Sequence, residues 1–118
     1  PAMTDLENLY HHAIQRVRLY PCCFSGAKRD YPVFALYPPE YQYYSHQIAD
    51  CGGWYRGTEM RLIGLDGCGN FYGLHCSGEV RFYKHADKSS TTLAKSEKEF
   101  LVGIREIENQ TISMPNGR

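Results

Sequence analysis

The fold is decided by residues 62–87, which read LIGLDGCGNFYGLHCSGEVRFYKHAD. Asp66-Gly67 and Gly69-Asn70 stand between two apolar runs, where a tight hairpin needs residues that tolerate positive φ. Ser77-Gly78 marks a second turn of the same kind. The stretch therefore predicts a meander of three short antiparallel strands.

The last of these strands is predicted to have one apolar face and one decorated face. Successive side chains along a strand point to opposite faces of the sheet. Val80 and Phe82 therefore share the predicted core face. The opposite face carries Arg81, Tyr83 and His85, which we expect to be exposed and available for function.

Helices are predicted on both sides of the meander. Residues 4–7 fit a capping box, and apolar residues at three-and-four spacing continue the helix until Pro21. Residues 96–99 form a second capping box, and the spacing continues the closing helix through Ile107. A further helix is expected over about residues 39–50, with Gly52-Gly53 as its stop.

The remaining segments are predicted as a loop and two short strands. Residues 22–30 mix Ser, Gly and charges, which is typical of a loop. Residues 31–37 favour a strand, and Pro32 favours an edge position because proline cannot donate to a ladder. Residues 91–94 add a fourth strand after the meander.

Length and pattern together favour one α+β domain. The chain has 118 residues, enough to bury most of its apolar surface around one core. The predicted fold class is α+β, an antiparallel β-sheet meander flanked by helices in a single domain over residues 1–118. Residues 1–3 resemble a vector-derived remnant before a start at Met3, and residues 109–118 are predicted to form a flexible tail.

Charge and cysteine content exclude several classes of partner. Thirteen basic residues balance thirteen acidic ones, so no global field favours nucleic acid or an anionic membrane. No apolar run approaches the ~20 residues that span a bilayer, and we expect a cytoplasmic protein. The cysteines are odd in number and irregular in spacing, which favours a reduced compartment: Cys22, Cys23, Cys51, Cys68 and Cys76.

Several segments of the chain resemble the SUKH superfamily. Residues 63–72 are similar to its IGxDGxGNxY stretch, and residues 78–87 to its G-x-V-x-F/Y strand that ends near His and Asp. Residues 93–96 with Phe100-Leu101 resemble the family's iadSFeeFL segment. The resemblance covers roughly residues 60 to 104, and a shorter similarity links residues 38–41 and Gly52-Gly53 to an LPedY…nGG helix.

The resemblance implies an α+β fold and a protein-binding function. In bacteria such domains are most often immunity proteins that neutralise a cognate polymorphic toxin, frequently a nuclease. Other members are regulatory or scaffolding modules, and the sequence leaves that alternative open because both functions need only a contact surface. The expected partner is therefore a toxin protein.

Aromatic residues, arginine, histidine and acidic groups are the candidates for partner contact. Aromatic anchors beside Arg carry much of the energy of interfaces, and acidic groups near loop ends complement the basic surface of a nuclease. Trp54 and Tyr72 fit the core equally well. The predicted partner-binding residues are Tyr43, Trp54, Tyr55, Arg56, Glu59, Asp66, His75, Arg81, Tyr83 and His85.

Metal and enzyme functions are weighed as less favoured alternatives. His75 and Cys76 stand near Cys68, but neighbours on a strand point to opposite faces and so do not readily share one ion. A Cys–His hydrolase based on Cys22 or Cys23 lacks a recognisable nucleophile context. The glycines of the first hairpin precede no helix and so do not form a phosphate loop. We therefore expect no metal, no cofactor and no catalytic residue.

Overall fold

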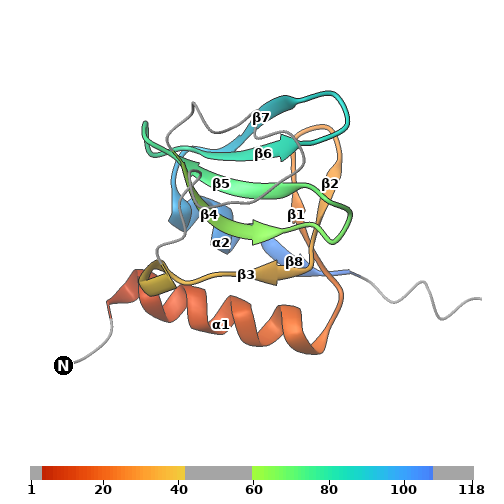
Figure 1. Cartoon of the computed structure of the whole chain (residues 1–118). Helices are drawn as coiled ribbons and strands as arrows, with labels where there is room; N and C mark the ends of the chain where they lie inside the picture. Colours follow the sequence, from red (N-terminus) through yellow and green to blue (C-terminus); the bar gives the residue numbers. More distant parts are fainter. Residues whose placement is uncertain (1–3, 42–59, 108–118) are drawn as a thin grey trace, which may run out of the picture.

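The computed structural model describes residues 4–41 and 60–107, which form an α+β fold of two antiparallel sheets and two helices (Figure 1). The predicted fold class is thus confirmed. The smaller sheet has the strand order β2-β1-β8 and the larger one β3-β4-β5-β6-β7. The elements are α1 (Asp5–Leu19), β1 (Cys22–Ser25), β2 (Asp30–Val33), β3 (Ala35–Leu36), η1 (Pro39–Tyr41), β4 (Met60–Leu65), β5 (Phe71–His75), β6 (Val80–Lys84), β7 (Ser89–Ala94), α2 (Glu97–Val102) and β8 (Ile104–Glu106).

Helix α1 begins at the predicted capping box. The Glu7 amide donates to the Thr4 hydroxyl at 3.1 Å, and the Thr4 amide donates to the Glu7 carboxylate at 2.8 Å. The helix ends at Leu19, and Tyr20 is already extended ahead of Pro21. No helix among the described residues is long and apolar enough to cross a membrane.

The predicted meander is confirmed as β4, β5 and β6, and β7 extends it as the fourth strand. The turn after β4 is built by Asp66, whose Oδ1 accepts from the amides of Cys68 at 2.7 Å and Asn70 at 3.0 Å. Gly67 and Gly69 have φ of +87° and +92°, a region that favours glycine. Local turn chemistry therefore fixes the first hairpin where the sequence places it.

The loop predicted over residues 22–30 is wrong over Cys22–Ser25, which forms the central strand β1 of the smaller sheet. Cys22, Cys23 and Phe24 are all buried, since both cysteines act as small apolar residues there. The strand predicted over residues 31–37 is instead two strands, β2 and β3, in different sheets. The edge position expected from Pro32 is confirmed, because β2 is the edge strand of its sheet.

The closing helix predicted through Ile107 is shorter, and Ile104 starts β8 rather than continuing α2. Gly103 marks the change: a Cβ there would lie 2.6 Å from the ring of Phe24. Only half of the second capping box forms. The Ser96 hydroxyl accepts from the Glu99 amide, but the Glu99 carboxylate accepts from the backbone amide of Lys95 and not from that of Ser96. Of the helix expected over about residues 39–50, Pro39–Tyr41 is a 3-10 turn and the rest lies outside the described residues.

The main core lies where the larger sheet meets the smaller sheet and the helices. The Tyr72 ring is 5.4 Å from that of Phe82 and 5.3 Å from that of Phe100, centroid to centroid. Its hydroxyl donates to the Pro32 carbonyl of β2, so one tyrosine joins the two sheets. The sequence fits Tyr72 equally well to the core and to the surface, and the structure places it in the core.

A buried polar cluster joins α1, β4 and α2. Arg61 is only 8% exposed, and its guanidinium forms an ion pair with the carboxylate of Glu97. The Tyr10 hydroxyl donates to the same carboxylate at 2.6 Å and accepts from Arg61 at 3.2 Å. Three elements far apart in sequence therefore meet at one carboxylate.

Replacing Glu97 tests the weight of this cluster. We expect Glu97→Ala to lower the free energy of unfolding by about 3 kcal/mol, because it leaves the buried Arg61 charge uncompensated. The double variant Arg61→Met/Glu97→Leu removes both charges and should recover most of that loss. Urea unfolding followed by circular dichroism measures both. A Glu97→Ala protein as stable as the parent would contradict the role of the cluster.

Alkaline pH tests the burial of the tyrosines. Burial raises the pKa of Tyr10, Tyr72 and Tyr83 above the ordinary value. Unfolded tyrosine ionises near pH ~10, so these groups stabilise the fold below that pH and the stabilisation is lost as the pH rises above it. Tyr72→Phe should cost about 1 kcal/mol at neutral pH through the lost hydrogen bond, and then lose less stability on alkalinisation than the parent. Parallel pH slopes for the two proteins would count against this account.

Candidate protein-interaction surface

The face of the meander that the sequence predicts to be exposed is in fact largely apolar, and it is buried at its centre. Val80 and Phe82 face the main core as predicted, but Tyr83 on the opposite face is 1% exposed, so its predicted exposure is wrong. Tyr83 forms a second cluster with Met60, Leu62 and Phe71.

Close packing across the strands explains this second cluster. The Tyr83 ring stacks on that of Phe71, with centroids 5.5 Å apart and an angle of 14° between the planes. Gly73 leaves room beside it: a Cβ there would lie 2.6 Å from the Met60 sulfur and 3.0 Å from the Tyr83 ring. Tyr83 is therefore a packing residue and is withdrawn as a partner contact.

Asp66 is also withdrawn as a partner contact, because it is buried and builds the turn. Its Oδ2 accepts from the Asn70 side-chain amide at 2.8 Å, in addition to the two backbone amides that Oδ1 holds. Asn70 in turn accepts from the amide of His85 at 2.8 Å. This chain of bonds fixes the end of β6, while the His85 side chain itself stays half-exposed.

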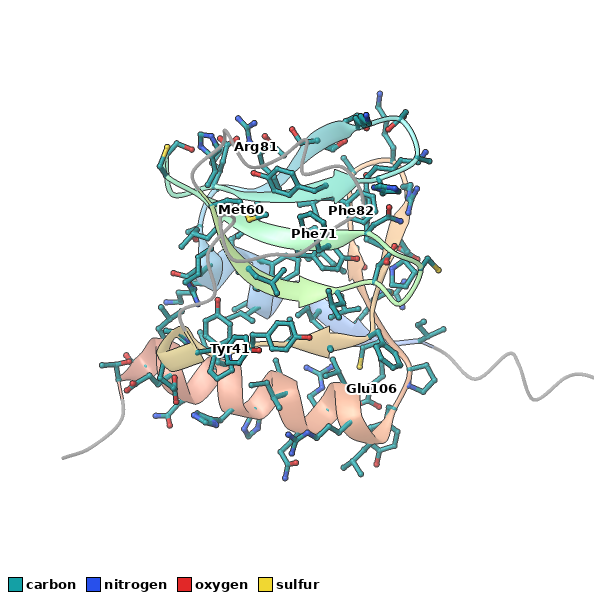
Figure 2. All side chains as sticks on the ribbon, in the orientation of Figure 1. Tyr41, Met60, Phe71, Arg81, Phe82 and Glu106 are labelled. Carbon is teal, nitrogen blue, oxygen red and sulfur yellow. The ribbon has the colours of Figure 1, made fainter. Side chains whose placement is uncertain are left out.

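Arg81 lies in a polar network across β6 and β7 (Figure 2). Its guanidinium pairs with Glu79, and the Thr92 hydroxyl donates to the same carboxylate at 2.8 Å. Hydrogen bonds from Arg81 and Thr92 lower the pKa of Glu79. Arg81 is half-buried, and its guanidinium also contacts Ser90 of β7 at 3.5 Å.

His75 lies at the turn between β5 and β6. Its Nδ1 accepts from the Ser77 amide at 3.2 Å and is 3.7 Å from the Cys76 sulfur. The expectation that the His75 and Cys76 side chains diverge is wrong, because Cys76 is in the turn and not on the strand. Within residues 4–41 and 60–107, no three His, Cys, Asp or Glu side chains come together as a metal site.

The other predicted contact residues cannot be placed. Tyr43, Trp54, Tyr55, Arg56 and Glu59 lie outside the described residues. Of the ten predicted contacts, three are described and not fully buried: His75, Arg81 and His85, each half-buried.

The two adjacent cysteines are unsuited to nucleophilic chemistry. Cys22 and Cys23 are buried on β1, and burial raises the pKa of both thiols. The Cys22 thiol donates to the carbonyl of Tyr20 at 3.4 Å. Since the thiolate is the reactive form, these thiols are held in their unreactive state at neutral pH.

A groove between α1 and β3 is a feature that the sequence reasoning missed. Its volume is about 860 Å³, and its walls are residues of α1 from His11 to Arg18 and residues 34–38. Phe34 is 69% exposed on its rim, and Tyr41, 53% exposed, stacks on Tyr37 with centroids 5.0 Å apart. Figure 1 shows α1 running alongside β3.

Polar groups lie toward both ends of this groove. His11 is 3.4 Å from the carboxylate of Glu40, so that end of the groove is polar. Arg18 at the other end is exposed and forms no ion pair with any residue in the described part of the chain. The groove thus combines an apolar floor, an exposed aromatic ring and one available cation.

One sequence signal for the groove was present in residues 31–37. The run Tyr-Pro-Val-Phe-Ala-Leu-Tyr has no polar alternation, so a strand built from it has apolar side chains on both faces. Tyr31, Val33 and Leu36 fill the main core. Phe34 lies at the break between β2 and β3 and is left pointing outward.

Alanine substitution on β6 tests the corrected burial. We expect Tyr83→Ala and Phe82→Ala each to cost about 3–5 kcal/mol of unfolding free energy, since both remove a buried ring. Lys84→Ala on the same strand is the control, because that side chain is exposed and should stay within about 0.5 kcal/mol of the parent. Thermal and urea unfolding give the comparison. Tyr83→Ala behaving like the Lys84→Ala control would restore the exposed assignment.

Comparisons with known proteins found no relative of this chain. No family model, no curated protein and no solved structure matched the chain. The α+β fold and the surface described above are therefore the basis on which a function is argued.

Proposed function

We propose that this protein is an immunity protein of the SUKH type, which binds a cognate bacterial toxin and blocks it by occlusion. The observation that carries the proposal is the groove between α1 and β3, with Phe34 69% exposed on its rim. A groove with an apolar floor and an exposed aromatic ring at its edge has the form that partner-binding sites take. The resemblance of residues 60 to 104 to SUKH domains supplies the class of partner.

The groove has the parts of a binding hot spot. Hot spots place aromatic and arginine anchors in a pocket surrounded by polar groups that exclude water. Phe34 and Tyr37 supply the aromatic rings, Arg18 supplies a cation, and His11 supplies a polar group that contacts Glu40 beside the groove. A toxin segment that buries Phe34 would gain the transfer energy of a large apolar ring.

The acidic residues of the described part do not restrict the toxin to a nuclease. Glu40 pairs with His11, Glu79 pairs with Arg81, and Asp87 accepts from Ser89 at 2.6 Å. The charge of Glu79 is balanced by Arg81, so these three groups do not by themselves favour a phosphate-binding surface on the toxin.

Inhibition by this route requires no bond-making chemistry. A bound protein excludes substrate from the toxin or holds it in an inactive state, with no cofactor and no catalytic residue on the inhibitor. The proposed site of action is the cytoplasm, where an incoming toxin would meet its target. A regulatory or scaffolding domain would use the same groove on a different partner, and a binding experiment with the neighbouring gene product separates the two.

Co-expression with the protein encoded by the neighbouring gene tests the proposal. We expect the chain to restore growth to cells that produce that protein and to form a stable complex with it. Phe34→Ser should weaken the complex by about 30-fold, the loss of one hot-spot side chain of ~2 kcal/mol. Val102→Ser is the matched control, because Val102 is 64% exposed on α2, away from the groove, and should bind like the parent.

The outcomes separate the function from the surface. Absence of both growth rescue and complex formation would refute the immunity function. A complex that Phe34→Ser and Val102→Ser affect equally would keep the function and remove the groove as its site. Calorimetric titration provides the dissociation constants, and thermal melts verify that both variants fold.

A further inference from the structure

The two ends of the groove between α1 and β3 differ in charge. At one end Arg18 is exposed and forms no ion pair with any residue of 4–41 and 60–107. Arg16 on the same helix differs, since the Glu106 carboxylate lies 3.4 Å from its guanidinium. At the other end the carboxylate of Glu40 lies 3.4 Å from His11. Arg18 is therefore the cation that an occupant of the groove would meet.

The groove has the size of a short helix. Its α1 wall runs from His11 to Arg18, which at ~1.5 Å per residue is about 10 Å, or two helical turns. Two turns of a helix ~11 Å across occupy roughly 1,000 Å³, and the groove holds about 860 Å³. Strand β3 on the opposite wall has only two residues, so it offers a short ladder to an added strand. The groove therefore suits a helix better than a strand.

The walls of the groove suit the apolar side of such a helix. Ile14, Val17, Leu36 and Pro38 line the groove, and Phe34 is 69% exposed on its rim. An amphipathic helix with apolar side chains at three-and-four spacing would cover these residues on one side and keep its polar side in water. The exposed aromatic ring would become the anchor of the contact.

The charge of α1 favours one direction for the bound helix. Helix α1 ends at Leu19, so the partial negative charge of its C-terminus lies at the Arg18 end of the groove. A helix antiparallel to α1 would bring its own N-terminus, with a partial positive charge, to that end. Acidic residues are favoured in the first turn of a helix, and in this direction they would also reach the guanidinium of Arg18.

A second copy of this chain fits the groove less well, although α1 has acidic residues in its own first turn. The apolar side of α1 is already used, since Tyr10 and Ala13 are buried in the main core. The surface that α1 leaves to solvent is polar and includes Asn8 and His12. The α1 helix of another folded copy would therefore bring few apolar side chains to Phe34. A helix whose apolar side is free in the partner is the better match.

We propose that the groove between α1 and β3 binds an amphipathic helix of a partner protein, antiparallel to α1 and with an acidic first turn beside Arg18. The identity of that partner as a toxin rests on the proposed function, whereas the fit of the helix rests on the groove itself. The apolar side of the helix would supply affinity by covering Phe34. The carboxylates would supply selectivity and a faster encounter.

A synthetic peptide tests the groove without a known partner. The probe is a helix of about fourteen residues, with two Glu in the first turn, Leu at three-and-four spacing on one side, and Ala and Gln elsewhere. A lactam bridge on the opposite side keeps it helical, because short helices are marginal in water. The probe should shift the backbone amide NMR signals of residues 11–18 and 34–37. A control peptide with Gln in place of both Glu should bind about 5-fold more weakly.

A charge swap tests the contact with Arg18. Arg18→Glu should weaken binding of the acidic probe by about 10-fold, because repulsion replaces attraction. A peptide with Lys in place of both Glu should bind Arg18→Glu more tightly than it binds the parent. Lys98→Glu is the matched control, since Lys98 is exposed on α2 outside the groove, and it should bind both peptides like the parent. Thermal melts verify that both variants fold.

A spin label tests the direction of the bound helix. A nitroxide at the N-terminus of the probe should broaden the amide signals of Val17 and Arg18 more than that of His11, because these residues lie at opposite ends of the α1 wall. The reverse pattern would contradict the antiparallel placement.

Other occupants of the groove give different results. Equal affinity for the acidic probe and its Gln control, or amide shifts that spare the groove, would overturn the proposal. Groove signals that move when the free protein is diluted would assign the groove to a second copy. Displacement of the probe by a peptide of residues 108–118 would assign it to that segment of the chain itself.

The outcomes for the helix and for the toxin are read separately. Binding of the neighbouring gene product that Phe34→Ser weakens and Arg18→Glu leaves intact would keep the immunity function and overturn the acidic helix. Binding of the acidic probe at the groove, by a chain that fails to bind the neighbouring gene product, would support the helix site and refute the toxin as its partner.

Discussion

The ion pair between Arg61 and Glu97, with the hydroxyl of Tyr10 on the same carboxylate, sets the relative positions of three elements. A buried charge pair contributes little net stability, but it tolerates few alternative arrangements because each unpaired partner is costly. By fixing α1 against β4 and α2, the pair also sets where α1 lies along β3. The groove that carries the proposed function therefore depends on a contact outside the groove itself.

Features that depend on neighbouring residues could be predicted from the sequence. The capping box of α1 and the Asp66 turn are each built from residues within four positions of one another, so their chemistry is readable directly. Pairing between distant segments was not readable in this way. β1 pairs with β8 across about eighty residues, and Ile104 has a spacing from Phe100 that fits a helix and a buried strand alike.

The candidate site was only partly predictable for a related reason. Alternation assigned Phe82 and Tyr83 correctly to opposite faces of the sheet, but it carries no information on whether a second apolar layer forms. Gly73 makes room for Tyr83, and this is a cross-strand relation that one strand alone does not reveal. The groove arises where residues 30–36 leave one sheet and join the other, a choice made by tertiary packing.

The central position of β1 has a consequence for how the protein forms during translation. Cys22–Ser25 pairs with β2 soon after synthesis, but its other edge stays open until Ile104–Glu106 has been made. Completion of the smaller sheet is therefore a late, long-range step, of the kind that slows folding and exposes apolar strands meanwhile. Until this last strand has been made, β1 keeps one edge unpaired and the smaller sheet is incomplete.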